Sequence, residues 1–324
     1  MKKSVLVLIA LGFSLSSFGQ DTLARDTTWI RGGFASLQFN QTSFTNWAAG
    51  GENSYSMSGL AFVFANYHFG KNYWNSYANL NYGLISTQYD KTIRKNTDLI
   101  ELQSKAGHEI GKKFYFSGLL NFRSQFANGY IYPNDSVVVS KFLAPGYLTA
   151  SIGVEWKPVD YFALYVSPTT GRFTFVTDQQ IADQVVNGAS LWGTDPAVYD
   201  TTGALISHGK TIRTEFGAYL TAIFLKEVVK NVSVASKVQL FNNYTDKNKP
   251  NRKNVDVLWD LLVNMKINNW LSAYLSGNLI YDNDIVIQDL DDNGVPTGTA
   301  GPRTQFKESF GLGLTLNFGD PLPK

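Results

Sequence analysis

The strongest constraint in this sequence is an alternation of apolar and polar residues close to its end, over residues 306–318. One parity holds the apolar residues Phe310, Leu312, Leu314, Leu316 and Phe318. Successive side chains of a β-strand point to opposite faces, so the pattern predicts a strand with one apolar and one polar face. Such a strand fits a soluble sandwich. It also fits the closing strand of an outer-membrane barrel, which turns its polar face to the lumen.

Similar alternation recurs in about twelve segments between Trp29 and Phe318, and the connections alternate in length. Connections after even-numbered segments are tight, whereas those after odd-numbered segments are long. A sandwich gives no reason for this pattern, but an outer-membrane barrel has short periplasmic turns and long outer loops. The longest connection runs from about residue 172 to about Lys210, and its residues 178–190 suit a short helix. The sequence therefore predicts an all-β fold, an antiparallel transmembrane β-barrel of about twelve strands.

The N-terminal residues have the features of an export signal. Lys2 and Lys3 precede a short apolar core, and Ser17 to Gly19 form a small-aromatic-small cleavage site. We expect a signal peptide at residues 1–19, a short periplasmic tail at 20–28, the barrel at 29–318 and a C-terminal tail at 319–324. The expected location is the cell outer membrane, with its lipid as the surrounding partner.

Composition excludes several classes of function. The chain has no cysteine, which excludes disulfides, thiolate metal sites and cysteine nucleophiles. Without residues 1–19, which hold two lysines and no acid, basic and acidic residues are equal in number, so no nucleic-acid partner is indicated. Charged residues make up 17% of the chain, below the ~25% typical of soluble domains.

The polar parity of the segments predicts the side chains that face the lumen. The charged members of this set are Glu101, Lys105, Glu109, Arg123, Glu155, Arg213, Glu215, Lys237, Asp256, Asp260 and Lys266. They would line an aqueous path, or they would pair across a narrow interior and make it rigid. Both signs are represented, so neither cation nor anion preference follows.

A partial calcium motif lies near the end of the chain. Asp289, Asp291 and Asn293 offer oxygen ligands at the first, third and fifth positions, and Gly294 follows. Ala300 stands at the twelfth position, where a bidentate glutamate belongs. The alternative is a polar turn at Asn293 and Gly294. Ca²⁺ in an outer loop is the one cofactor that the sequence suggests.

Enzymatic activity is not predicted. A lipid-facing phospholipase would need a Ser–His pair, and the chain has three histidines, His68, His108 and His208. Ser104 lies on the parity of His108 but about 13 Å away along one strand, too far for proton transfer. No catalytic residue is therefore assigned.

Several runs resemble an uncharacterised Bacteroidota family of exported barrel-like proteins, catalogued as a domain of unknown function. The runs are residues 46–53, 99–105, 121–126, 140–147, 167–171 and 173–176. The resemblance implies an outer-membrane location and supplies no substrate or functional residue. The leading expectation from all these features is a pore or transporter for small solutes, or a transport accessory. The alternative is a closed structural barrel whose outer loops bind a protein partner of unknown identity.

Overall fold

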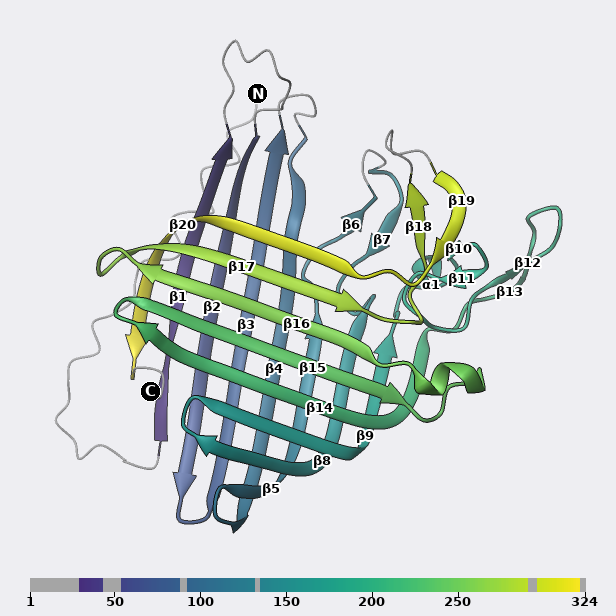
Figure 1. The fold of residues 1–324 in the computed structure, drawn as a ribbon. Coiled ribbons are helices and arrows are strands. Elements are labelled where there is room, and N and C mark those ends of the chain that lie inside the picture. The colour runs from purple at the N-terminus through teal and green to yellow at the C-terminus, as the bar shows by residue number, and fades with distance from the viewer. Residues whose placement is uncertain (1–28, 43–53, 88–91, 132–134, 291–295, 321–324) are drawn as a thin grey trace.

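The computed structural model describes residues 29–42, 54–87, 92–131, 135–290 and 296–320. Within them, twelve antiparallel strands close into a barrel in chain order (Figure 1). The barrel strands are β1 (Trp29–Thr42), β2 (Ser54–Phe69), β3 (Asn72–Thr87), β4 (Arg94–Gly111), β5 (Phe114–Ser124), β8 (Gly146–Val159), β9 (Phe162–Phe175), β14 (Ile212–Val229), β15 (Val232–Asn243), β16 (Asp256–Lys266), β17 (Leu271–Tyr281) and β20 (Gln305–Gly319). The predicted all-β barrel of about twelve strands is confirmed.

The two ends of the barrel differ in the length of their connections. Two-residue turns join β2 to β3, β4 to β5, β8 to β9 and β14 to β15, and a four-residue turn joins β16 to β17. β1 begins and β20 finishes at this end, as the predicted arrangement requires. The long connections after β5, β9, β15 and β17 gather at the other end, on the right of Figure 1. Among the described residues, no helix is both long and apolar enough to cross a bilayer.

The long connections contain short elements of their own. They are β6 (Gly129–Tyr130), β7 (Val138–Ser140), α1 (Gln179–Ala182), β10 (Val185–Val186), β11 (Ala189–Ser190), β12 (Val198–Tyr199), β13 (Leu205–Ser207), η1 (Lys249–Lys253), β18 (Ile287–Leu290) and β19 (Pro296–Gly301). α1 lies in the segment where the sequence suggested a helix. Its first turn is capped by the Asp178 carboxylate, which accepts from the backbone N–H groups of Gln180 and Ile181.

Alternation of side chains sorts the barrel into an apolar outside and a mainly polar inside. Exposed apolar residues on the outer parity include Leu37, Val63, Leu102, Phe116, Ile152, Phe216, Leu275 and Leu314. Trp74, Trp156, Trp270 and Phe318 are exposed near the tight turns. Aromatic residues at such positions form the interfacial girdles of outer-membrane barrels. On β2, Tyr55, Met57 and Val63 lie outside.

Two strands are longer than the sequence suggests. β9 was expected to end at the run from Ser167 to Gly171, but it continues to Phe175. The register shifts beside this run, against both β8 and β14, so Pro168 sits where the ladder is already interrupted. β8 likewise continues through Lys157 and Pro158 to Val159, again past a register shift. The bulge in β9 turns the side chain of Arg172 toward the lumen, whereas Lys157 in β8 keeps the inward parity of Glu155.

Candidate functional site: the barrel lumen

A charged bridge crosses the lumen between β15 and β4, which lie on opposite sides of the barrel. Lys237 Nζ is 2.8 Å from Glu101 Oε1 and donates to the Tyr77 hydroxyl at the same distance. Asn121 Nδ2 donates to Glu101 Oε1 at 3.1 Å, and Arg123 interacts electrostatically with Glu101. A buried carboxylate with several donors is well stabilised, so the bridge ties the two walls together.

A second cluster lies around Glu155, whose carboxylate is fully buried. Glu155 Oε1 accepts from Lys105, whereas Glu155 Oε2 accepts from the Tyr73 hydroxyl and lies 3.0 Å from Lys157 Nζ. Tyr73 and Ser117 are 2.8 Å apart through their hydroxyl oxygens. The cluster holds two cations on one carboxylate in a buried place, so loss of that carboxylate would leave both cations unpaired.

A third cluster centres on Glu215 near the loop end. Arg172 binds Glu215 with two hydrogen bonds of 2.8 and 3.0 Å, and it reaches Asp256 at 2.6 Å. Arg213 lies 2.9 Å from Glu215 and also pairs with Asp284 in the loop after β17. Asp284 is outside the strands. Burial and the nearby carboxylate of Asp282 raise its pKa, although the Arg213 guanidinium opposes that rise.

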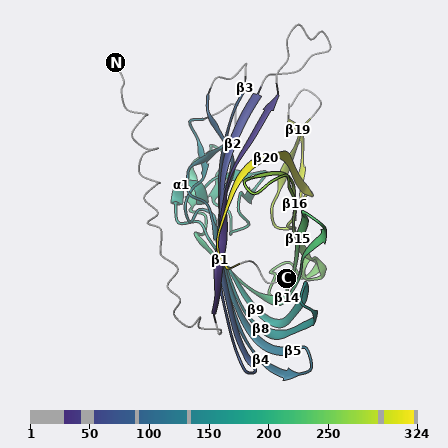
Figure 2. The same ribbon diagram turned by 90° about the vertical axis from the view of Figure 1, so that its left-hand side faces the viewer.

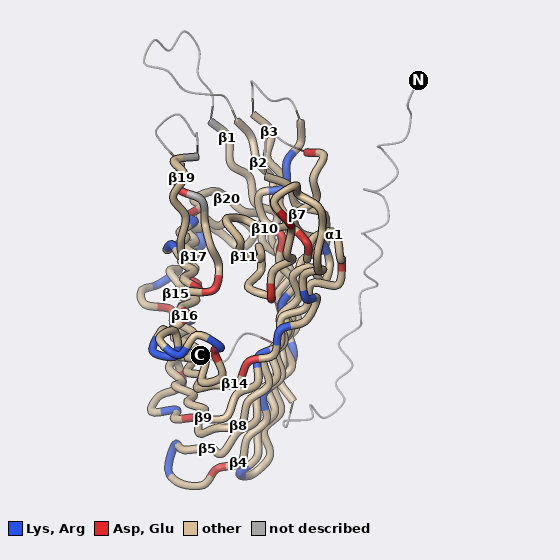
Figure 3. The backbone as a smooth tube through the Cα atoms, turned by 90° about the vertical axis from the view of Figure 1, so that its right-hand side faces the viewer, with Lys and Arg blue, Asp and Glu red and all other residues tan. Residues whose placement is uncertain are grey.

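Most residues of these clusters belong to one half of the barrel, which we call the packed arc: β4, β5, β8, β9, β14 and β15. Tyr73 and Tyr77 of β3 and Asp256 of β16 join them from the neighbouring strands. Its inward side chains are largely buried, and those of Leu119, Tyr165, Tyr219 and Phe241 pack as one apolar cluster inside the lumen. Figure 3 shows that both signs of charge are interspersed along the barrel wall. The interior of the packed arc is therefore filled by paired charges and aromatic rings.

The other half, which we call the open arc, consists of β16, β17, β20, β1, β2 and β3. Most of its inward side chains remain partly exposed, although Phe64, Tyr73 and Tyr274 are buried. The partly exposed set includes Ser36, Gln38, Ser58, Leu60, Asn79, Leu258, Asp260, Leu262 and Ser276. Since these residues point inward, the open arc leaves accessible space inside the barrel.

An apolar patch lines the open arc on β1 and β2. Phe34 and Phe62 stack at 5.7 Å between ring centroids, and Phe62 lies 6.3 Å from Phe64 and 5.6 Å from Tyr77. Leu60 continues the patch on β2 toward the loop end. Apolar rings in a polar lumen provide a surface for the apolar part of a solute.

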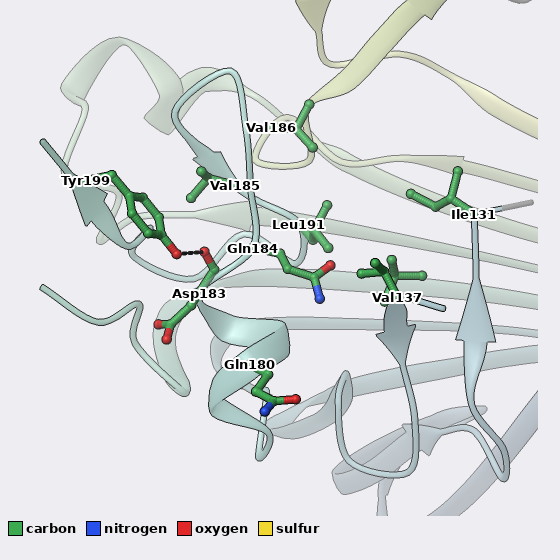
Figure 4. Close-up of a pocket in the computed structure, with 10 residues that line it drawn as sticks. Ile131, Val137, Gln180, Asp183, Gln184, Val185, Val186, Leu191 and Tyr199 are labelled. Carbon is green, nitrogen blue, oxygen red and sulfur yellow. Dashed lines mark hydrogen bonds between the residues drawn. The ribbon is translucent and has the colours of Figure 1, made fainter. Parts of the chain in front are cut away.

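The outer loops fold over the packed arc as a compact lobe. Ala144, Val176, Ile181 and Ala182 are buried together, and Trp192 Nε1 donates to the Val139 carbonyl at 2.9 Å. An open apolar cavity of about 540 Å³ lies between β7 and the segment after α1 (Figure 4). Its lining includes Ile131, Val137, Val185, Val186, Leu191 and Tyr199.

Hydrogen bonds hold the carboxylates of this lobe in their charged form. The Lys141 ammonium donates to Asp178 and, with the backbone N–H groups of α1, lowers the pKa of that carboxyl. Burial works to raise the pKa of Asp183, but hydrogen bonds from His208, Gln179 and the Gly209 N–H outweigh it and the pKa falls. The His208 ring is thereby engaged by Asp183 at 2.8 Å, and His108 lies 2.8 Å from Asn72.

The structure places the predicted lumen residues in different surroundings. Glu101, Lys105, Glu155 and Glu215 are buried within the clusters, and Arg123, Arg213, Lys237, Asp256 and Asp260 adjoin them. Glu109 is half-buried near the tight turns, and Lys266 is exposed at the end of β16. Arg172 was missed because it follows a bulge in β9 that changes the parity, and the nearby Pro168 is the signal that marks it. Lys157 keeps the inward parity of Glu155 and was missed because it lies beside Pro158, at the irregular end of β8.

Of the three residues of the calcium hypothesis, only Asp289 lies within the described residues. Asp289 is engaged by Arg303, which donates to both carboxylate oxygens at 2.9 and 2.6 Å. Asp291 and Asn293 lie outside the described residues, as do the expected signal peptide and the tail at residues 20–28. Within the described ranges, no group of three His, Asp or Glu side chains is arranged to hold a metal ion. Calcium binding stays a prediction.

Comparison with known proteins gives one family match and several barrels. A family model described as a protein of unknown function (DUF3078) matches residues 39–130, and no curated protein matches the chain. An outer membrane channel from Pseudomonas putida F1 is 11% identical, with a TM-score of 0.39 over 92% of this chain and 100% of that one. The translocator domain of the autotransporter NalP from Neisseria meningitidis is 11% identical, with a TM-score of 0.35 over 90% of each chain. The TodX monoaromatic hydrocarbon channel is 9% identical, with a TM-score of 0.30 over 90% of each chain.

Proposed function

We propose that this chain is an outer-membrane barrel that conducts small solutes along the open arc. The closed hydrogen-bonded sheet and the exposed apolar side chains of its outer face suit a bilayer, because a closed barrel satisfies its backbone polar groups internally. The observation that carries the pore is the difference in burial between the two arcs. Most inward side chains of the open arc keep access to the interior, whereas a larger share of those in the packed arc is buried.

The residues facing the open arc predict weak charge selectivity. Asp260 and Lys307 contribute opposite charges, and most of the other partly exposed inward groups are hydroxyls, amides and apolar side chains. Ion selectivity requires rings of like charge or aligned dipoles. The open arc therefore suits neutral solutes better than ions of one sign.

Planar-bilayer recording tests the proposal directly. Purified mature protein is expected to give steady unit currents that differ little when potassium chloride is replaced by salts of larger cations or anions. Liposomes containing the protein are expected to swell in small neutral sugars. Electrical silence, together with liposomes that do not swell, would contradict a pore.

The second candidate is a surface-interaction barrel, and the cavity of about 540 Å³ in the loop lobe favours it. Apolar side chains around an open cavity offer a binding surface at the loop end (Figure 4). A variant with Val137→Asp and Leu191→Asp separates the two candidates. A pore keeps its conductance in this variant, whereas a protein that acts through its loops keeps the barrel and loses its binding.

A further inference from the structure

The seam that closes the barrel is paired over only part of its length. The β1–β20 register runs from Gly32 with Gly319 to Phe39 with Leu312, and the described residues show no registered pair beyond it. β20 nevertheless continues toward the loop end as far as Gln305, paired only with β17. It runs beside β17 and then bends to meet β1, while β1 extends past the bend (Figures 1 and 2). The two strands therefore diverge above Phe39.

The outward side chains beside this split are of both kinds. Phe39 on β1 and Phe306 and Phe310 on β20 are exposed apolar residues, the last at 63%. Gln41 on β1 and Glu308 on β20 are exposed polar residues of the same outward parity. An unpaired strand edge is not tolerated against hydrocarbon unless it faces protein or a water-filled cavity. Since the open arc lies behind the split, the free edge of β20 has access to the lumen.

One side chain fills the start of the split. The Asn40 amide lies beside Gly311, where an added Cβ would stand 2.0 Å from it and 2.7 Å from the Tyr274 hydroxyl. In the orientation that satisfies both ends of the amide, its nitrogen donates to the carbonyl of Phe39 at 3.1 Å and to that of Phe310. The side-chain hydrogen bonds of Asn40 thus take the place of the backbone pair that would follow Phe39 and Leu312. These bonds can break while both strands stay folded.

The lumen behind the split changes from polar to apolar. Next to Asn40, the Gln38 amide accepts from Ser58 at 3.0 Å. Farther along β1 and β2 lie Leu60 and the stacked pair of Phe34 and Phe62. A molecule with one hydroxyl and one apolar end matches this order, because the hydroxyl finds amide partners and the rest contacts aromatic rings.

We propose that the split between β1 and β20 is a lateral portal, through which small uncharged amphipathic molecules pass between the open arc and the surrounding lipid. Asn40 is the side chain that closes it. The portal rests on the proposed function in one respect, since the open arc must admit solutes. An alkylphenol, with one hydroxyl and a short apolar tail, is the simplest probe of this class.

Cross-linking across the split tests the portal. The chain has no cysteine, so introduced pairs are the only thiols. The split pair, Gln41→Cys with Phe310→Cys, places two outward thiols above the last registered pair, and a short bifunctional methanethiosulfonate joins them. Leu37→Cys with Leu314→Cys is the matched control pair, because these outward positions are already in register.

Ion current reports entry of the probe. With 4-hexylphenol dissolved in the bilayer, the current through the wild type and the cross-linked control pair is expected to fall at least about twofold as probe enters the lumen. The cross-linked split pair is expected to keep its current, and reduction should restore the block. Block that persists after this cross-link would overturn the portal. Gly311→Ala, which displaces Asn40, should lower the concentration of 4-hexylphenol that is needed to block the current.

Photo-cross-linking decides the portal even if no current is found. A benzophenone amino acid at Ser309, an inward position beside the split, is expected to form adducts with lipid chains. The same group at Ser36, an inward position paired in register with Thr315, is expected to form none. Equal labelling at both positions, or no lipid adduct at Ser309, contradicts the portal. Adducts at Ser309 without conductance would retain the portal and reject the pore.

Discussion

The packed arc and the open arc have the same secondary structure and opposite interiors. In the packed arc, Glu155 and Glu215 are buried with cations on both, and Tyr165, Tyr219 and Phe241 fill the remaining space. In the open arc, Ser36, Ser58 and Ser276 leave their part of the lumen partly exposed. Strand pairing alone therefore does not decide whether a barrel is filled. The size and pairing of the inward side chains decide it.

The difference also assigns separate roles to the arcs. Paired buried charges and a packed core give one wall that resists distortion. The open arc has small inward residues and a short β1–β20 seam, so fewer contacts break when its strands move apart. Substitutions of the same kind on the two arcs should therefore have unequal effects, which the following experiments exploit.

The largest effect is expected from Glu155→Leu. It leaves Lys105 and Lys157 buried without a counter-charge, which should lower the free energy of unfolding by about 3–5 kcal/mol. Urea unfolding in detergent micelles, followed by tryptophan fluorescence, measures this. Asp260→Leu in the open arc is the control, with an expected loss of about 1 kcal/mol. Equal losses would abolish the distinction between the arcs.

Aromatic truncation should give a somewhat smaller contrast. Phe241→Ala opens a cavity in the buried cluster and should cost about 3–4 kcal/mol of unfolding free energy. Phe62→Ala removes a partly exposed ring and should cost less than half as much. The same unfolding assay compares the two variants. A greater loss in Phe62→Ala would place the main core in the open arc.

Removing the charged bridge between β15 and β4 should widen the lumen. Lys237→Met removes the cation that joins β15 to β4, and we expect unit conductance to rise by about twofold as the cross-section widens. Planar-bilayer recording measures it. Lys266→Met, at an exposed position at the end of the neighbouring strand β16, should leave the current unchanged.

The smallest effect concerns the loop lobe and depends on pH. Because the folded pKa of Asp178 is lowered, its charged form stabilises the lobe above the unfolded pKa, and this contribution is lost as pH falls through the folded value. Hydrogen-exchange protection factors in residues 176–211, which correct for the intrinsic exchange rate at each pH, should fall between pH 6 and pH 3 by an amount near the ~1 kcal/mol of a helix cap. Asp178→Asn keeps a capping group without a charge, so its protection factors should show a flatter pH dependence.

Much of the fold was predictable from local pattern. The alternation of apolar and polar residues over 306–318 predicted a strand, and the alternating lengths of the connections placed the tight turns at one end of the barrel. Charges on the inner parity, such as Glu101 and Lys237, were predicted to line the lumen. Their partners were not, because Glu101 and Lys237 are distant in sequence and only barrel closure brings them within 2.8 Å.

Bulges limited the prediction of the site. The sequence predicts a connection from about residue 172, but β9 continues to Phe175, past a bulge at Pro168. The residue inserted in β9 reverses the facing of every later side chain, so Arg172 escaped the alternation. Lys157 keeps the parity of Glu155 but lies beside Pro158, at the irregular end of β8. In the closed sheet, hydrogen bonds to the neighbouring strands keep a strand continuous past such an interruption. The local sequence does not predict these bonds, because their partners lie in other strands.

The sequence by itself determined which residues form strands, which parity is apolar and which end carries the long loops, because these depend on the neighbours of each residue along the chain. Only the tertiary structure decided that one half of the lumen is filled, that the other is accessible and that β1 and β20 part above Phe39. Those features depend on which strands face each other across the barrel. The stagger of the closed sheet sets that relation, and no local pattern encodes it.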